Sequence, residues 1–235
     1  MTHRHHLVAL VAALAIGACD PTGNTNISSD AANVRLANFL TDTPLVTLSA
    51  GVVPVQSNIA FGAPSIYKLV STNTQELAVK RSTDATPIGA DSVNLILGRH
   101  YTYYVLGITT AAKTKFATDD TVFAAAGKVK IRFLHGIKAQ STKGIDLYVS
   151  LPGDTSLALL TPIVPSLAYG SASAYVPVDT SLRRVRLTLT GLTSTIFDST
   201  FAAGINDSSV VTIVATDKIG GGAPVRVQVV TDKAP

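Results

Sequence analysis

The side chains of this sequence that are best suited to chemistry are few and lie far apart. His135 and His100 are the two histidines beyond the first residues, and an imidazole can act as a general base near neutral pH. Asp119 and Asp120 form an adjacent carboxylate pair, but neighbouring residues of a strand point to opposite faces, which a glycosidase site does not allow. Two histidines in separate halves also make a poor zinc site. We therefore expect no catalytic residue, no metal site and no cofactor, and the alternative is divalent-cation binding at the aspartates of turn-like stretches.

The elements that must position these side chains are predicted to be short strands. Residues 128–133 (KVKIRF) and 184–189 (RVRLTL) alternate polar and apolar side chains with a period of two, as half-buried strands do. Residues 101–106, 209–215 and 225–230 are rich in β-branched or aromatic side chains. No long segment has helical spacing of its apolar residues, so we predict an all-β protein. With 235 residues, 46% of them hydrophobic, the chain is long enough for one large or two small domains.

An internal repeat sets the predicted number of domains. Residues 59–67 (IAFGAPSIY) align without gaps with residues 167–175 (LAYGSASAY). The same comparison relates residues 34–38 to 131–135, 77–80 to 185–188, Gly98 to Gly204, and 117–120 to 230–233. The chain is therefore predicted to hold two tandem immunoglobulin-like antiparallel β-sandwich domains, residues 33–126 and 127–235, with residues 121–127 as connector.

This repeat bears directly on the role of His135, because Asn38 takes its place in the first copy. An asparagine side chain cannot act as a base near neutral pH, but it forms hydrogen bonds as histidine does. A hydrogen bond that fixes a loop explains both copies, whereas catalysis explains only one. We expect His135 to be structural.

Basic side chains gather in the second half of the chain. On the predicted strands they are Lys128, Lys130 and Arg132, then Arg184 and Arg186, and finally Arg226. If these strands are neighbours, the six side chains form a basic stripe that suits an anionic polysaccharide, lipid headgroups or another acidic surface. The simpler interpretation is that they cover a solvent face and protect strand edges from pairing. Nucleic acid is excluded as a partner because the chain is predicted to be exported and lacks aromatic stacking platforms.

The first residues predict export and lipid attachment. A short basic start precedes an apolar run at residues 7–18, which is shorter than the roughly 20 residues that span a bilayer. Residues 16–19 (IGAC) resemble the lipobox of bacterial lipoproteins, in which the cysteine is lipidated and becomes the first residue after cleavage. The alternatives are an ordinary secretory signal followed by a free cysteine, or a buried thiol. We expect residues 1–18 to be removed, Cys19 to be acylated, and residues 19–32 to form a flexible tether. As Cys19 is the single cysteine, no intramolecular disulfide forms.

Three motifs together resemble a known bacterial family. Residues 128–135 (KVKIRFLH), 145–149 (IDLYV) and 167–170 (LAYG) with Tyr175 are similar to the domain of unknown function 4397, which is usually found on exported proteins and often in tandem. The resemblance extends over residues 33–233 and is stronger in the second copy. It implies a fold and a location, and it transfers no catalytic residue.

These observations predict a non-catalytic, lipid-anchored protein of the bacterial cell envelope, facing the periplasm or the cell surface. It would act as a binding, adhesion or structural module, held to the membrane by its N-terminal lipid, with envelope polysaccharide or protein as candidate partners. The alternative is an exported hydrolase with an unrecognised active site. A hydrolase should show a cleft with convergent ionisable groups and perturbed titration, and a binding module should not.

Overall fold

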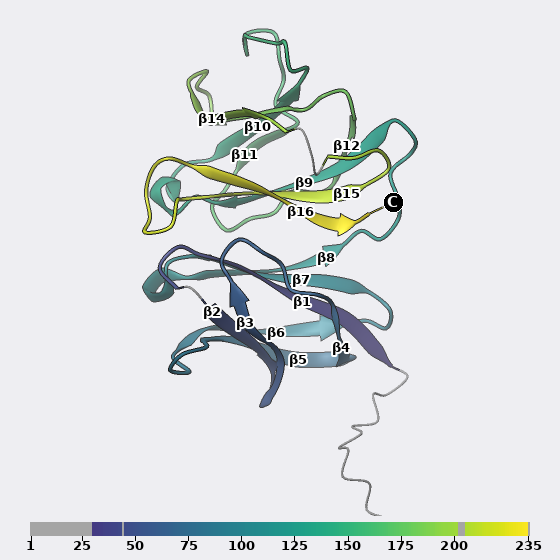
Figure 1. Ribbon diagram of the computed structural model, residues 1–235, viewed down its shortest axis with the longest axis vertical. Helices are drawn as coiled ribbons and strands as arrows, with labels where there is room; N and C mark the ends of the chain where they lie inside the picture. Colours follow the sequence, from purple (N-terminus) through teal and green to yellow (C-terminus); the bar gives the residue numbers. More distant parts are fainter. Residues whose placement is uncertain (1–29, 44, 202–204, 235) are drawn as a thin grey trace, which may run out of the picture.

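A computed structural model describes residues 30–43, 45–201 and 205–234 of the chain. Within these residues the elements are strands and two short 3-10 helices, Thr109–Ala111 and Lys138–Gln140, without an α-helix (Figure 1). The expected all-β class is confirmed. The described residues include no helix that is long and apolar enough to cross a bilayer.

The first half of the chain forms a sandwich of two four-stranded sheets. Its strands are β1 (Ala31–Leu40), β2 (Leu45–Ala50), β3 (Val53–Ala60), β4 (Lys68–Ser71), β5 (Asn73–Arg81), β6 (Pro87–Leu95), β7 (His100–Gly107) and β8 (Lys113–Asp119). One sheet has the order β4-β1-β7-β8 and the other β3-β2-β5-β6.

The second half repeats this arrangement strand for strand. Its strands are β9 (Lys128–Gly136), β10 (Ile145–Ser150), β11 (Val164–Leu167), β12 (Val176–Asp179), β13 (Arg184–Leu189), β14 (Thr195–Thr200), β15 (Val210–Thr216) and β16 (Arg226–Lys233). The sheets have the orders β12-β9-β15-β16 and β11-β10-β13-β14. Each sandwich contains one parallel pair, β1 with β7 or β9 with β15, and the other pairs are antiparallel. Each therefore has eight strands, one more than the seven of an immunoglobulin constant domain, in a different order.

Hydrogen bonds at equivalent places support the alignment of the two halves. The Gly62 amide donates to the Asn38 carbonyl at 2.8 Å, and the Gly170 amide donates to the His135 carbonyl at 2.8 Å. The segment that follows each bond leads into an edge strand, β4 in the first half and β12 in the second.

One pair in the predicted alignment differs. In the parallel registers Arg35 lies beside Thr102, and Arg132 lies beside Thr212. The structural counterpart of Gly98 is therefore Ser208, and both have a positive φ, 70° and 61°. Gly204, which was aligned with Gly98, lies outside the described residues.

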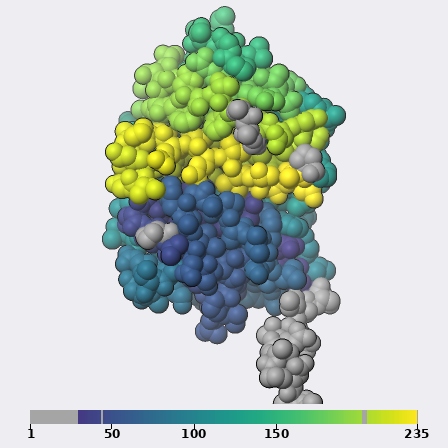
Figure 2. Space-filling model, in the orientation of Figure 1, coloured from purple at the N-terminus to yellow at the C-terminus, as the bar shows by residue number. Residues whose placement is uncertain are grey.

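The two sandwiches face each other through the sheets that contain β1 and β9, and they are stacked one above the other in Figures 1 and 2. The alternating side chains of these strands therefore enter two different interiors. Leu36 lies in the apolar core of the first sandwich, whereas Ala37 and Leu134 belong to a third apolar cluster that forms between the halves. Strands that are buried on both faces lose the polar-out pattern of a half-buried strand.

Candidate functional site

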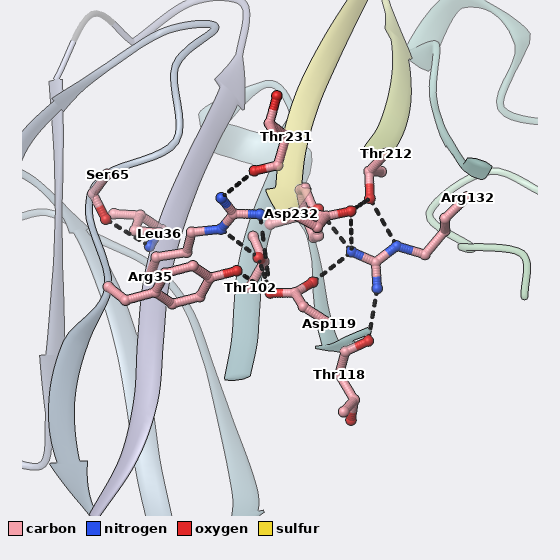
Figure 3. Close-up of polar contacts among 12 residues, drawn as sticks. Arg35, Leu36, Ser65, Thr102, Thr118, Asp119, Arg132, Thr212, Thr231 and Asp232 are labelled. Atoms are coloured by element: carbon pink, nitrogen blue, oxygen red, sulfur yellow. Dashed lines mark hydrogen bonds and ion pairs between the residues drawn. The ribbon is translucent and has the colours of Figure 1, made fainter. Parts of the chain in front are cut away.

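Charged and hydroxyl side chains meet at the centre of the interface between the halves (Figure 3). We call this cluster the charged seam, and it consists of Arg35, Tyr67, Thr102, Asp119, Arg132, Tyr175, Thr212 and Asp232. It is built by strands β1, β7 and β8 of the first half, by β9, β15 and β16 of the second, and by the residue preceding β4 or β12.

Arg132 of the second half forms an ion pair with Asp119 of the first. Its Nη2 lies 2.6 Å from Asp119 Oδ1, its Nε donates to Thr212 Oγ1 at 2.9 Å, and its Nη1 donates to the Thr118 carbonyl at 2.9 Å. Three nitrogens of one guanidinium are thus fixed by both halves, an arrangement for which the planar arginine fork is suited.

Arg35 of the first half forms the reciprocal set of contacts. Its Nη2 lies 2.5 Å from Asp232 Oδ1, its Nε donates to Thr102 Oγ1 at 2.7 Å, and its Nη1 donates to the Thr231 carbonyl at 2.9 Å. Each half therefore supplies one arginine and one aspartate, and each aspartate is bound by the arginine of the other half.

Two tyrosines complete the coordination of the carboxylates. The Tyr67 hydroxyl donates to Asp119 Oδ2 and the Tyr175 hydroxyl to Asp232 Oδ2, both at 2.8 Å. The ring of Tyr67 lies 4.6 Å from the Arg35 guanidinium carbon, and that of Tyr175 lies 4.7 Å from the Arg132 carbon. Each tyrosine thus adds a hydrogen bond to the anion and a cation–π contact to the cation.

Burial decides what this cluster can do. The side chains of Asp119 and Asp232 are 0% exposed, and Arg132 is 3% exposed. Burial raises the pKa of Asp232, while Arg132 and Arg35 act against that rise. Burial likewise raises the pKa of Tyr67 and Tyr175. Because the carboxylates are shielded from solvent and already accept several hydrogen bonds, the seam offers no free group to a substrate, and its role is to hold the halves together.

An open pocket of about 430 Å³ lies beside the interface, and we call it the junction pocket. It is lined by Leu40, Thr41, Asp42, Thr43, Ala60 and Phe61 of the first half and by Ile219 and Gly220 of the second. The Gly220 amide donates to the Thr41 carbonyl at 2.8 Å, so the pocket depends on both halves. Its walls are mostly apolar, and Asp42 is the one ionisable residue in its lining. A pocket of this kind can bind a ligand but holds no acid–base pair.

The equivalent place in the second half holds a larger aromatic residue. Tyr169 takes the position that Phe61 has in the repeat, and its hydroxyl lies against Gly107 of the other half. Lys138 Nζ lies 5.9 Å from the centre of the Tyr169 ring, and burial raises the pKa of this tyrosine to about 12. The counterpart of Phe61 thus has a larger side chain with a cation beside its ring.

A second pocket of about 260 Å³ contains the ionisable groups that a hydrolase would need, among them His100, Asp119 and Asp120. Asp119 belongs to the seam, and Asp120 Oδ2 accepts a hydrogen bond from Lys130 Nζ at 2.6 Å. The pKa of Asp120 is lowered because its bonds to Lys130 and to the Val122 amide outweigh the effect of burial. A carboxyl group with a lowered pKa stays ionised near neutral pH, so Asp120 is not suited to act as a general acid there. Asp119 is buried at the end of β8 and Asp120 is partly exposed just beyond it, and both line this pocket, so the predicted placement on opposite faces of one strand is wrong.

The structure does not bring the predicted basic residues onto one surface. The condition was that their strands be neighbours, but β9 and β13 belong to different sheets. On β9, Lys128 forms an ion pair with Asp179 at 2.6 Å, and Lys130 is bound to Asp120.

The remaining four basic residues are scattered. Arg132 is part of the seam, and Arg186 is 1% exposed and donates to Ser150 Oγ at 2.8 Å. Arg184 forms an ion pair with Asp198 at 2.7 Å, and Arg226 lies exposed at the start of β16. The alternation at residues 128–133 and 184–189 predicted that the polar side chains face solvent. Arg132 instead faces the buried interface between the two halves.

His135 and Asn38 form the loop-fixing hydrogen bonds that the repeat predicts. Asn38 Oδ1 accepts from the Leu40 amide at 3.0 Å, and His135 Nδ1 accepts from the Ile137 amide at 3.2 Å. Burial lowers the pKa of His135 to about 4, so the imidazole is neutral around pH 7. The bond to the amide two residues ahead is common to both halves.

In the part of the chain that the structure describes, no group of three or more His, Cys, Asp or Glu side chains could hold a metal ion. Cys19, the predicted lipidation site, lies outside the described residues.

Sequence reasoning did not identify Arg35, Asp232 and Tyr67 as functional residues. The signal was present, because each recurs in step with Arg132, Asp119 and Tyr175 in the repeat. An arginine and an aspartate retained at equivalent strand positions of both copies indicate a shared buried contact.

Comparison with known proteins finds that part of the chain is similar to a sequence family. Residues 32–148 match the family described as Domain of unknown function (DUF4397). The match begins in β1, includes all strands of the first half and ends in β10, so the LAYG motif and Tyr175 lie beyond it.

No curated protein matches the chain. Two solved structures align with it at a TM-score of 0.27. One is the family 26 carbohydrate-binding module CBMbc from Eubacterium rectale Amy13K in complex with maltoheptaose, with 10% identity over 87% of this chain and 98% of that chain. The other is described as alpha-glucan binding by a streptococcal virulence factor, with 13% identity over 84% of this chain and 96% of that chain. At this TM-score neither protein serves as a guide to what this chain binds.

Proposed function

We propose that this chain is a non-catalytic, lipid-anchored protein of the bacterial cell envelope, made of two DUF4397 copies that act as one binding body. The observation that carries this proposal is the contrast between the seam and the junction pocket. The buried charges of the seam are satisfied by one another, and the open pocket beside them has a single ionisable side chain. A rigid body with an accessible apolar pocket is suited to binding.

The junction pocket favours a ligand with an apolar face and hydroxyl donors at its rim, as a sugar ring has. Phe61 and Ile219 supply apolar surface, and Asp42 supplies the acceptor. Both carboxylate oxygens of Asp42 accept from the Thr109 amide, at 2.9 and 3.0 Å, which fixes the group at the rim of the pocket. A carboxylate forms stronger hydrogen bonds to donors than a neutral oxygen does. Envelope polysaccharide is therefore the partner class that we propose.

The binding test compares two matched variants of the full mature protein. Ile219→Ser removes a wall of the pocket, and Leu192→Ser removes a similarly exposed apolar side chain from the turn between β13 and β14; the two are 61% and 52% exposed. Binding to immobilised envelope polysaccharide should weaken in Ile219→Ser and stay unchanged in Leu192→Ser. Equal binding by both variants would remove the pocket from the proposal. Release of sugar fragments during the assay would instead support the hydrolase alternative.

Lipid attachment is proposed from the layout of residues 1–19. Intact-mass measurement of protein extracted from membranes should give a chain that begins at Cys19 and carries acyl chains, and Cys19→Ser should move the protein to the soluble fraction. An unmodified thiol at Cys19 would overturn the anchor.

A further inference from the structure

The chain enters its fold at one end of the first sandwich. Ala31, the first residue of β1, pairs with Ser71 of β4, and its carbonyl accepts from the Gly98 amide at 3.0 Å. The start of β1, the end of β4 and the loop between β6 and β7 thus lie together. We call this part of the molecule the entry end, and in Figure 1 it lies at the lower right, where the grey trace joins β1.

The turn between β2 and β3 projects from the same end. The Gly51 amide donates to the Glu76 carbonyl at 2.8 Å, near the start of β5, and Asn73 of β5 pairs with Leu95 at the end of β6. Both the β2–β3 turn and the β6–β7 loop therefore extend beyond the ends of their sheet in one direction. In Figures 1 and 2 the blue hairpin forms the lowest projection of the described chain.

Apolar side chains are exposed at the entry end in unusual number. Twelve large apolar side chains are exposed in the described residues, and six of them lie here: Val52, Val53, Ile66, Leu69, Ile96 and Leu97. Val52 is 97% exposed at the tip of the β2–β3 turn, and Leu97 is 57% exposed in the β6–β7 loop. Single exposed apolar residues need no explanation, but a cluster on one end marks a contact surface.

A groove and basic side chains accompany this cluster. The edge strands β3 and β4 border a groove of about 470 Å³, lined by Val53, Pro54, Val55, Tyr67, Lys68 and Leu69. Lys68 at its rim is exposed, as is Arg99 in the β6–β7 loop. Cations beside apolar tips suit a surface with anionic headgroups above an apolar layer.

The number of residues between Cys19 and β1 limits how far the proposed lipid can lie from this surface. Eleven residues follow Cys19 up to Asp30, so a lipid on Cys19 lies within about 40 Å of the entry end even if the segment is fully extended. A bilayer that holds this lipid therefore lies within about 40 Å of the entry end, close enough for the exposed apolar side chains there to reach it.

We propose that the entry end rests on the bilayer, with Val52 and Leu97 inserted into the headgroup region and the second half directed away from the membrane. This proposal rests on the lipid anchor of the proposed function. It adds a second, non-covalent attachment, which fixes the orientation of the protein as well as its distance from the membrane.

The single cysteine of the chain makes a direct test possible. Once Cys19 is acylated, Val52→Cys and Leu97→Cys each provide one reactive thiol for a polarity-sensitive fluorophore. Leu159→Cys is the matched control, because Leu159 is 97% exposed in the loop between β10 and β11 of the second half. The labelled full-length lipoproteins are reconstituted into phosphatidylcholine–phosphatidylglycerol vesicles that contain a lipid-attached quencher.

Probes at positions 52 and 97 should lose most of their emission to the quencher and shift to shorter wavelength, whereas the probe at 159 should do neither. Equal quenching at all three positions would overturn the bilayer contact. So would an absence of quenching at positions 52 and 97 in protein whose acylation is confirmed by mass. Either result would leave the lipid anchor intact. Absence of acylation would instead overturn the proposed function. Val52→Cys with Ile96→Ser and Leu97→Ser added should show weaker quenching than Val52→Cys alone, because the neighbouring tips no longer favour insertion.

Discussion

The two halves of the chain are alike in the sheets that face each other and differ in their outer sheets. On the facing sheets the same residue types recur at equivalent positions, and the ion pairs and tyrosine contacts repeat almost distance for distance. On the outer sheets, a two-residue turn joins β2 to β3, whereas residues 151–163 join β10 to β11. At the position of Arg186 in the second half, the first half has Ala78. This equivalence follows from the pairing of β13 with β10 and of β5 with β2. Contact between the halves constrains which residues the facing sheets carry. The residues of the outer sheets differ between the halves because no such contact constrains them.

The strongest challenge to this comparison is to remove one carboxylate of the seam. Asp119→Ala and Asp232→Ala should each lower the free energy of unfolding by about 3–5 kcal/mol, because each leaves a buried arginine without its partner. Asp198→Ala, which breaks the more exposed pair with Arg184, should cost about 0–1 kcal/mol. Chemical denaturation measures all three. Clearly unequal losses for Asp119 and Asp232 would show that the two sides of the seam are not equivalent in energy.

Glycine substitution sharpens the contrast between the interface and an outer turn. Gly107 has a φ of 92°, and a Cβ there would meet the Tyr169 hydroxyl of the other half, whereas Gly51 has a φ of 55° and open space around it. Gly107→Ala should lower the unfolding free energy by about 2–4 kcal/mol and Gly51→Ala by about 1–2 kcal/mol. Thermal denaturation of both variants measures the difference. A loss for Gly107→Ala no larger than that for Gly51→Ala would argue against close contact between the halves at that point.

Removing single hydroxyl groups tests the symmetry of the seam at finer scale. Tyr67→Phe and Tyr175→Phe each abolish one hydrogen bond to a buried carboxylate and should cost about 1.5–3 kcal/mol. The two losses, measured by urea titration, should agree, since the rings keep their contacts with the arginines. A loss at one tyrosine alone would assign the tighter carboxylate contact to that side.

The pH dependence of stability tests the loop position at which the two halves differ by one ionisable residue, His135 in place of Asn38. Burial holds the pKa of folded His135 at about 4, below its usual 6.5, so the unfolded chain takes up the proton first as the pH falls. The contribution of His135 to stability is fully present above pH 6.5 and is lost by about 1.4 kcal/mol for each pH unit down to about 4. His135→Asn copies Asn38 and should lack this part of the pH dependence. Parallel stability curves for the two proteins would contradict the buried neutral imidazole.

The repeat and the strand pattern predicted much of the fold because both depend on local sequence. The alternation in residues 128–133 located β9, and the gap-free alignment of residues 59–67 with 167–175 paired the halves correctly. The same alternation misled us about Arg132, since a polar residue that points out of its own sandwich looks the same whether water or another sandwich covers it.

The candidate site was harder to predict because its partners are far apart in the sequence. Arg35 and Asp232 are separated by 197 residues, and no local pattern relates them. The junction pocket depends on one further contact between distant segments, the bond from the Gly220 amide to the Thr41 carbonyl. Only the recurrence of Arg35 and Asp119 as Arg132 and Asp232 could have shown that these residues share a structural role.

The exchange of ion pairs between Arg35, Asp232, Arg132 and Asp119 describes a self-complementary surface. A face that carries one arginine and one aspartate in this geometry is matched by an identical face turned through half a revolution, which is the definition of an isologous contact. A chain with a single such sandwich would therefore have the means to form a symmetric homodimer. Here the same contact is made within one polypeptide, so the association of the two sandwiches does not depend on protein concentration.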